Sequence, residues 1–597
     1  MSATAADNLC ERLIEWDVST VYGFPGDGIN GLLGALRRHQ DQLRFVQTRH
    51  EEMAAFMACG HAKFTGEVGV CMATSGPGAI HLLNGLYDAK LDHRPVVAIV
   101  GQTFVRAIGG DFQQEVKLLQ LYSDVASAFC QQVNEPSSVR HLIDRAMRIA
   151  QAERTVTCVI VPADVQDMDA VEAQPHKTHT VHSGVGYWPA RVVPPQDQLK
   201  RAAEILNAGE KVAMLVGQGA LDATDEVIAV ADALGAGVAK ALLGKAAVPD
   251  DVPFCTGSIG LLGTRPSWEM MQEADTLLMV GSSFPYSEFL PKEGHVKAIQ
   301  IDLLGRMLSI RYPMDLALEG DSKQSLKELL PLLERKQERS WQQQIEQNVS
   351  EWWELMDEQG EPADRDGRIR PQGLFTALSR QLPDLAILSS DSGSAANWYA
   401  RHIRIRRGMK AMLSGNLATM VPGVPYAIAA KFAYSDRVAI AMVGDGAMQM
   451  GGMAEMLTAA KYYKTWADPR MVVLVLNNED LNQVTWEQRV MEGDPAFEAS
   501  QDIPYVDYAA YAELIGLRGI KLTASDEIEG AWREALSADR PVIISALSDP
   551  NEPPLPPHIT FEQAEAFASS VLADPSNGLP GAVESVREKV HEFLPGR

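Results

Sequence analysis

Two short segments, with Asp445 in one and, 33 residues later, Asn478 in the other, predict a diphosphate bound through a metal ion. Gly444-Asp445-Gly446 ends one apolar run, and Asn478 ends the next apolar run along the chain. Glycines let the backbone turn tightly at a strand end while the carboxylate faces outward. A carboxylate, an amide oxygen and a backbone carbonyl suit Mg²⁺, which commonly shares its ligands with phosphates.

An acidic segment near the N-terminus could supply proton chemistry. Residues 49–52 read Arg-His-Glu-Glu, and the apolar run EEMAAFMA begins at Glu51. These neighbours favour burial of Glu51, and an acid transfers protons best when its pKa lies near the working pH. The alternative is a solvated acidic helix start formed by Glu51 and Glu52.

Composition limits the classes of function. A chain of 597 residues is too long for one core and predicts three or four domains. The net charge of −25 and the pI near 5.0 argue against a basic surface for nucleic acid. The first residues lack a signal-peptide pattern, no apolar run is long enough to span a bilayer, and the six cysteines lack CxxC spacing. We expect a cytoplasmic enzyme with reduced thiols and no nucleic-acid partner.

Twelve short apolar runs alternate with longer amphipathic stretches, which is typical of parallel sheets with crossover helices. The runs are 44–47, 68–74, 95–101 and 155–162; 212–217, 238–243, 276–283 and 296–302; and 385–391, 438–445, 471–478 and 541–547. The predicted fold class is α/β, with three doubly wound parallel-sheet domains at 1–170, 190–335 and 370–550 and a tail at 551–597. Ligands are expected at the carboxyl ends of the strands.

The GDG segment, the Asn pair at 477–478 and the upstream acid together resemble the thiamine diphosphate (ThDP) enzymes of the pyruvate oxidase and acetolactate synthase group. The likeness runs nearly end to end. It implies a pyrimidine-binding first domain, a central FAD-type domain and a diphosphate-binding third domain. It also implies that Asp445, Asn478 and the main-chain carbonyl of Asp480 hold Mg²⁺ on the cofactor diphosphate.

In the first domain, the resemblance gives Glu51 the role of activating acid. It would hydrogen-bond the aminopyrimidine ring, whose own nitrogen then removes the thiazolium C2 proton. Pro25 and Gly26, in the run YGFPG, would shape the loop near that ring. Three histidines lack metal-like spacing and are interpreted as structural: His50, His81 and His93.

Two further segments of this domain match the family. TSGPG at 74–78 is interpreted as a strand-to-helix turn whose glycines allow close approach of the backbone. DFQQE at 111–115 resembles a DxFQE pattern, which would put Phe112 and Gln113 near the reacting carbon. Gln114 is a departure, because the family usually has glutamate at that step.

The third domain would grip the cofactor diphosphate. Met420, in LATMVPGVP, matches a methionine that wedges between the two cofactor rings and holds them bent. The other residues that the resemblance assigns to cofactor binding here are Ser392, Gly393, Gly444, Gly446 and Ala447. Because a first domain meets the third domain of another subunit in this family, a homo-oligomer (a dimer or a homotetramer) is implied.

The middle domain resembles the flavin-binding domain of pyruvate oxidases. The residues assigned to FAD are Gly217, Gly219, Asp302 and Asp321. A third glycine at Rossmann spacing is missing, so NAD is not supported. The alternative is a vestigial domain that keeps its strand-end turns without flavin.

The choice of reaction depends on the segment after the Asn pair. Glu487 stands where pyruvate oxidases and quinone-linked pyruvate dehydrogenases have glutamate, whereas acetolactate synthases have tryptophan. Val484 matches the small aliphatic residue near the reaction centre in both branches. Gln483 replaces the aromatic residue expected in oxidases, and Asn482 replaces the common glycine.

The resulting prediction is ThDP- and Mg²⁺-dependent oxidative decarboxylation of pyruvate or a similar small 2-oxo acid. Electrons would pass to FAD and then to oxygen or a quinone. Two alternatives stay open: a non-redox carboligase or lyase such as acetolactate synthase, and a ThDP-binding scaffold without catalysis.

The tail carries an amphipathic pattern at 581–594, with Val583, Val586, Val590 and Phe593 on one helical face. Quinone-linked relatives dock on membranes through a terminal amphipathic helix, which makes peripheral membrane contact one interpretation. The mixed charges lack the basic bias of membrane-surface helices and favour docking against the body of the protein.

Overall fold

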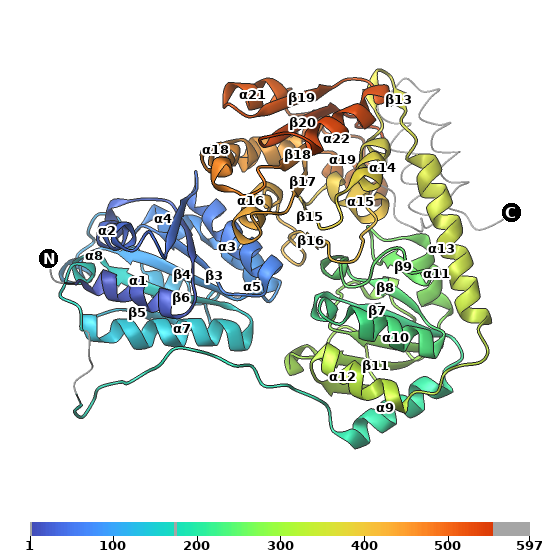
Figure 1. The fold of residues 1–597 in the computed structure, drawn as a ribbon, viewed down its shortest axis with the longest axis horizontal. Coiled ribbons are helices and arrows are strands. Elements are labelled where there is room, and N and C mark those ends of the chain that lie inside the picture. Colours follow the sequence, from blue (N-terminus) through green and yellow to red (C-terminus); the bar gives the residue numbers. More distant parts are fainter. Residues whose placement is uncertain (1–2, 172–175, 553–597) are drawn as a thin grey trace.

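The computed structural model describes residues 3–171 and 176–552, which form three parallel β-sheets covered by helices (Figure 1). Each sheet has six strands, in the orders β2-β1-β3-β4-β6-β5, β12-β11-β10-β7-β8-β9 and β16-β15-β17-β18-β20-β19. These sheets confirm the predicted α/β class with three doubly wound parallel-sheet domains. The strand order reverses between β1 and β3, between β7 and β10 and between β15 and β17, where open α/β sheets bind ligands.

The first domain has helices on both faces of its sheet (Figure 1). Its strands are β1 (Thr20–Gly23), β2 (Arg44–Gln47), β3 (Gly69–Ala73), β4 (Val96–Gln102), β5 (Cys130–Gln132) and β6 (Val156–Pro162). One apolar core lies beneath α1 (Ala5–Glu15), α2 (Asn30–Arg38) and α7 (Val139–Glu153). The opposite face packs against α3 (Glu51–Thr65), α4 (Pro77–His81) and α5 (Leu83–Leu91).

The middle domain has its own apolar core. Its strands are β7 (Val212–Val216), β8 (Gly237–Lys240), β9 (Cys255–Ser258), β10 (Thr276–Val280), β11 (Lys297–Asp302) and β12 (Leu316–Glu319). The main helices are α9 (Gln196–Ala208), α10 (Thr224–Leu234), α11 (Arg265–Glu273), α12 (Ser322–Leu329) and the long α13 (Ser340–Gln359), which leads toward the third domain (Figure 1).

The third domain begins with the short antiparallel pair β13 (Asp364–Arg365) and β14 (Arg368–Ile369). Its main strands are β15 (Ile387–Ser390), β16 (Lys410–Met412), β17 (Ala439–Gly444), β18 (Met471–Asn477), β19 (Arg518–Leu522) and β20 (Val542–Leu547). One face packs against α14 (Pro371–Gln381), α15 (Ser394–His402) and α22 (Ile528–Leu536). The other packs against α16 (Gly423–Ala433), α18 (Met453–Tyr462) and α21 (Tyr508–Leu514).

The prediction of four strands per domain was incomplete, because each sheet has two more. Five of the six missed strands, β5, β9, β12, β16 and β19, are sheet edges. Edge strands are short and need not be apolar on both faces, so they lack the continuous apolar runs that mark buried parallel strands. The sixth, β1, lies inside the sheet but has only four residues.

The first and third domains share one apolar core, in which α3 packs along α16 (Figure 1). This contact joins the helix that begins at Glu51 to the domain that carries Asp445. None of the described helices is long and apolar enough to cross a membrane. The amphipathic pattern predicted at 581–594 lies outside the described residues.

Candidate functional site

Asp445 lies where the chain leaves β17, with its side chain in a cradle of backbone amides. Its Oδ2 accepts hydrogen bonds from the amides of Asn478 (2.8 Å) and Glu479 (2.6 Å), and its Oδ1 accepts one from Gly446 (2.9 Å). Strands β17 and β18 pair in parallel, with Gly444 opposite Leu476, so their carboxyl ends meet. The structure therefore brings Asp445 and Asn478 together.

Burial raises the pKa of the Asp445 carboxyl to about 6, although the three backbone amides lower it. The residue is only 2% exposed. Removing a carboxylate from water disfavours its charged form, and a nearby cation would reverse that effect. Asp445 thus has the environment of a group that a cation would hold ionised.

The residues around Asp445 supply the hard oxygen donors that Mg²⁺ requires. The amide oxygen of Asn478 accepts a hydrogen bond from the backbone of Asp480 at 3.1 Å, which closes a tight turn after β18. Glu479, inside that turn, has φ of +63°, a left-handed conformation that favours glycine. Carboxylate, amide and backbone oxygens thus fit Mg²⁺ at this strand end.

Met420 lies against the same strand end. A Cβ atom added at Gly446 would lie 3.2 Å from the Met420 Cε and 2.7 Å from a Leu481 methyl carbon. Glycine at 446 therefore leaves the space in which Met420 sits. The methionine predicted to support a cofactor lies beside the predicted metal-binding turn.

A cavity of about 790 Å³ runs between the third and middle domains. Among the predicted residues of the third domain, its lining includes Ser392, Gly393, Met420, Val484 and Glu487. From the middle domain it includes Gly217, Gly219, Asp302 and Asp321. Sites for drug-sized ligands and cofactors usually measure about 300–1,000 Å³. Nine predicted residues, from Gly217 to Glu487, thus line one cavity.

Close backbone packing explains the two glycines of the middle domain. A Cβ at Gly217 would lie 2.4 Å from the Gly281 carbonyl oxygen, and one at Gly219 would lie 2.7 Å from the Gly281 Cα. These contacts join the loops after β7 and β10 at the point where strand order reverses. The glycines let both loops form one wall of the cavity.

Two acids complete that wall. Asp302 ends β11, accepts a hydrogen bond from the Leu304 amide at 2.9 Å, and has its pKa raised by burial. Asp321 caps the N-terminus of α12 by accepting a hydrogen bond from the Gln324 amide at 2.9 Å. Both carboxylates could accept hydrogen bonds from the hydroxyl groups of a nucleotide sugar.

Glu51 is the first residue of α3, and it is buried as predicted, with a side chain 9% exposed. Its Oε2 lies 3.0 Å from His81 Nδ1 at the end of α4. The His81 ring stacks on His50 with 4.4 Å between ring centroids. Gly78 leaves room for the carboxyl group, since a Cβ there would lie 3.1 Å from Glu51 Oε1.

The histidines were interpreted from spacing alone, and the structure adds a contact that spacing did not show. His50, Glu51 and His81 form a cluster whose ligand atoms lie within 4.8 Å of one another. Its members come from two helices, so no short sequence motif contains them. The TSGPG turn ends three residues before His81, and it was the available sequence signal for this residue.

The loops that follow β1 and β3 meet at the switch point of the first sheet. A Cβ at Gly26 would lie 2.5 Å from the Thr74 Cβ, so only glycine fits. Ser75 Oγ donates a hydrogen bond to Gln114 Oε1 at 2.8 Å, and Gln114 has φ of +62°. Gln114, the neighbour of the predicted Gln113, therefore contacts the TSGPG turn. Phe112 is 54% exposed.

The predicted residues thus fall into two groups. The first-domain residues Pro25, Gly26, Glu51, Phe112 and Gln113 do not line the 790 Å³ cavity. The first-domain residues that do line it are Leu91, His93 and Arg154. Within the described parts of one chain, Glu51 therefore does not line the cavity that contains Met420.

Two polar residues that were not predicted as site residues, Gln483 and Asn397, connect Glu487 to α15. Gln483 Nε2 donates to Glu487 Oε1 at 2.9 Å, and Asn397 Nδ2 donates to Gln483 Oε1 at 2.8 Å. Asn397 is fully buried on α15. A polar chain thus leads from this helix to the cavity, at the position where an aromatic residue was expected.

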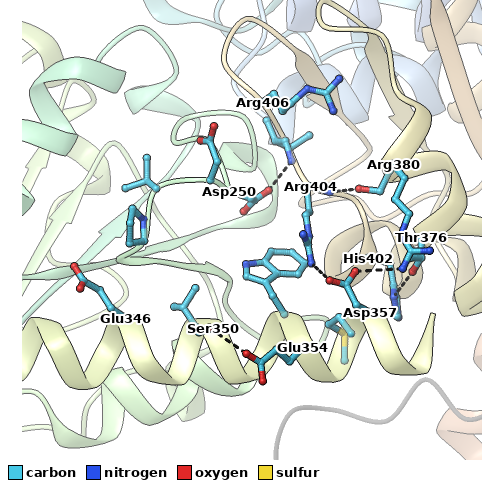
Figure 2. A pocket seen from close by; sticks show the side chains of 18 residues that line it. Asp250, Glu346, Ser350, Glu354, Asp357, Thr376, Arg380, His402, Arg404 and Arg406 are labelled. Atoms are coloured by element: carbon cyan, nitrogen blue, oxygen red, sulfur yellow. Dashed lines mark hydrogen bonds and ion pairs between the residues drawn. The ribbon is translucent and has the colours of Figure 1, made fainter. Parts of the chain in front are cut away.

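A second cavity, of about 660 Å³, lies between α13, α14 and the segment after α15 (Figure 2). Arg404 donates a hydrogen bond to Asp357 at 2.7 Å there, and its guanidinium lies 4.4 Å from the centre of the Trp353 ring. None of the predicted site residues lines it.

Comparison with known proteins gives the family. Sequence models of the thiamine pyrophosphate enzymes match the N-terminal TPP binding domain at 3–121, the central domain at 199–329 and the C-terminal TPP binding domain at 391–546. The chain belongs to the thiamine pyrophosphate enzyme family. The matched ranges contain Glu51, the cavity wall of the middle domain, and Asp445 with Asn478.

Individual relatives match almost the whole chain. A Bacillus subtilis protein described as thiamine pyrophosphate-containing, YdaP, is 38% identical over 95% of this chain and 96% of its own. Pyruvate oxidase of Lactiplantibacillus plantarum is 27% identical over 94% and 90%. The large subunit of acetolactate synthase isozyme 2 of Escherichia coli is 31% identical over 90% and 95%. The chain is thus an enzyme of the ThDP family with relatives in both the oxidase and the synthase branches.

Proposed function

We propose that the protein catalyses oxidative decarboxylation of pyruvate or a similar small 2-oxo acid, with ThDP and Mg²⁺ as cofactors and FAD as electron acceptor. Each turnover would release CO₂ and transfer two electrons to the flavin. The remaining acyl carbon would leave as acetate or acetyl phosphate, and oxygen or a quinone would reoxidise the flavin.

The observation that carries the proposal is the single cavity that joins both sets of residues. Met420, Val484 and Glu487 lie on one side, and Gly217 and Asp302 lie on the other. Electron transfer requires the two reacting groups to be neighbours, and a continuous cavity makes this arrangement accessible within one chain. A vestigial middle domain would need no such continuity.

Each residue of the third domain would have a distinct task. When bound, ThDP supplies a carbon nucleophile that also stabilises the negative charge left after CO₂ departs. Asp445, Asn478 and the carbonyl of Asp480 would hold Mg²⁺ on its diphosphate, near the backbone of Ser392 and Gly393. Met420 would support the cofactor rings, and Val484 would limit the space around the reacting carbon.

Glu51 would donate its proton to the pyrimidine ring and take it back. Burial and the contact with His81 keep its carboxyl group in one orientation. Because Glu51 and the other predicted site residues of the first domain do not line the cavity of their own chain, we propose that Glu51 serves a cofactor held by a second copy. The working unit would then be a homo-oligomer, at least a dimer.

A second candidate is a non-redox carboligase of the acetolactate synthase type. Gln483 favours it, because this polar residue stands where an oxidase would have an aromatic side chain beside the flavin. The sequence similarity to acetolactate synthase large subunits also supports this reading.

Product analysis separates the two. The purified protein would be incubated with pyruvate, ThDP, Mg²⁺, FAD and ferricyanide, and both acetate and acetolactate would be quantified. The proposal expects one acetate and two reduced ferricyanide ions for each CO₂. Acetolactate, formed with one CO₂ for each two pyruvates and no reduced ferricyanide, would establish the carboligase instead.

A further inference from the structure

A buried ionic cluster joins the first domain to the loop that carries Met420. Lys63 of α3 lies between Asp88 of α5 and Asp92 at the end of α5, and all three side chains are fully buried. Lys63 Nζ lies 2.7 Å from Asp92 Oδ2 and 3.3 Å from Asp88 Oδ1. Burial alone would lower the pKa of Lys63, but the two carboxylates outweigh it and raise that pKa, so the ammonium group stays charged.

The Lys63–Asp88–Asp92 cluster forms hydrogen bonds with residues 413–416. Lys63 Nζ donates to the Leu413 carbonyl at 2.7 Å, and Ser414 Oγ donates to Asp88 Oδ1 at 2.8 Å. Asp92 accepts hydrogen bonds from the Gly415 amide at 2.9 Å and from the Asn416 amide at 2.8 Å. The side-chain amide of Asn416 adds another bond to Asp92 at 2.9 Å.

The same segment is conformationally strained. Ala418 has φ of +51° and Val421 has φ of +89°, on either side of Met420. Left-handed backbone disfavours residues with a Cβ, and a β-branched residue most of all. Such conformations persist where the surrounding contacts over-determine them. The bonds to Asp92 provide that constraint here: burial opposes ionisation of this carboxyl, but Lys63 and the loop amides outweigh it and lower the pKa of Asp92. Hydrogen bonds to charged groups are stronger than those between neutral groups.

The 413–421 segment also forms part of the cavity wall. Leu413, Ser414, Gly415, Asn416, Ala418 and Met420 all line the 790 Å³ cavity. A further link runs through Asn84, whose amide donates to Thr419 Oγ1 at 3.2 Å and to Glu52 Oε1 at 2.6 Å. Glu52 follows Glu51 in α3, so one helix supports both the acid and the loop of Met420.

We propose that the Lys63–Asp88–Asp92 cluster positions the cofactor: it clamps the strained 413–421 segment so that Met420 and the cavity wall are preformed before ThDP binds. The inference rests on the proposed role of Met420 in holding ThDP. Lys63, Asp88, Asp92 and Asn416 are positioning residues, since they would act through Met420.

The test uses Asn416→Ala, which keeps Lys63, Asp88 and Asp92 and removes two side-chain hydrogen bonds, one to the Asp92 carboxylate at 2.9 Å and one to the Leu91 carbonyl at 3.0 Å. Amide hydrogen exchange of the 413–421 region in the cofactor-free protein would report the loop, and titration with ThDP and Mg²⁺ would report affinity. We expect faster exchange in this region and about tenfold weaker ThDP binding, the effect of one bond to a charged group.

A rescue variant makes the test specific. Ala418→Gly removes the Cβ at a left-handed position and should relieve strain. In the Asn416→Ala background it should restore a large part of the ThDP affinity. Tyr87→Phe is the matched control, because it likewise removes one hydrogen bond to an acid. Tyr87 lies on α5, as Asp88 does, and donates to Asp124 at 2.7 Å, not to the 413–421 segment.

Faster exchange with unchanged ThDP affinity in Asn416→Ala would overturn the inference and leave the proposed function intact. A failure of Ala418→Gly to recover any affinity would likewise overturn it, because strain would then play no part. If the wild-type protein itself does not bind ThDP, the proposed function fails, and the inference fails with it. Normal thermal unfolding of each variant would confirm that the fold is retained.

Discussion

The buried carboxyl of Asp445 predicts how the stability of the cofactor-free protein varies with pH. Its pKa is about 6 in the folded chain because burial disfavours the charged form, against an ordinary value of 3.8. The folded state therefore holds this proton more tightly than the unfolded state does. The associated stability is fully present below about pH 4 and is lost as the pH rises through about 6.

The size of the effect follows from the same two values. Each factor of ten in proton affinity corresponds to about 1.4 kcal/mol, so the complete loss amounts to about 3 kcal/mol. About half of this loss of stability occurs above about pH 5, where the protein can be handled conveniently. Mg²⁺ and ThDP would remove the destabilisation caused by ionised Asp445, because the cation would pair with the carboxylate. Their stabilising effect on the folded protein should therefore grow over the same pH range.

The assay compares urea unfolding of the cofactor-free wild type with that of Asp445→Asn across this pH range. Asparagine cannot titrate, so the difference between the two proteins isolates Asp445 from all other groups. The wild type should lose stability relative to the variant as the pH rises toward about 7. A difference that does not change with pH, or that changes in the opposite direction, would refute the reasoning.

Three further predictions concern the site. Glu51→Gln should slow C2 proton exchange of bound ThDP by about 10²–10⁴, the usual contribution of an acid–base group; an unchanged exchange rate by NMR would remove Glu51 from this role. Met420→Ala should weaken ThDP binding about tenfold, since it removes apolar contact worth about 1.5 kcal/mol; calorimetric titration would detect this, and equal affinities would contradict it. Gly219→Val should abolish flavin binding and spare ThDP, because its Cβ would lie 2.7 Å from the Gly281 Cα; visible absorbance of the purified variant checks this, and a normal flavin content would count against the cavity assignment.

Much of the fold could be predicted from the sequence because buried parallel strands are continuous apolar runs. β4, β6 and β18 have every residue buried, and each was predicted. β19 has a mixed pattern, with Arg518 and Lys521 exposed, and it was missed. An edge strand forms because it pairs with a neighbouring strand, and the sequence pattern alone does not reveal that pairing.

The site residues likewise divide into those that the sequence could predict and those that it could not. Asp445 and Asn478 lie at strand ends that pair directly, so local motifs sufficed to predict their proximity. His81, Asn397 and Lys63 act through contacts between separate elements, and their spacing along the chain carries no signal. Gln114 was noted as a departure from a pattern, whereas its contact with Ser75 needed the fold of the loop.

The central claim is that ThDP chemistry in the third domain delivers electrons to a flavin in the adjoining cavity. The most direct test is the visible spectrum of the purified protein, reconstituted with FAD, ThDP and Mg²⁺ under anaerobic conditions, before and after addition of pyruvate. The account predicts a bound yellow flavin that bleaches. A bound flavin that stays oxidised while CO₂ is released would contradict it.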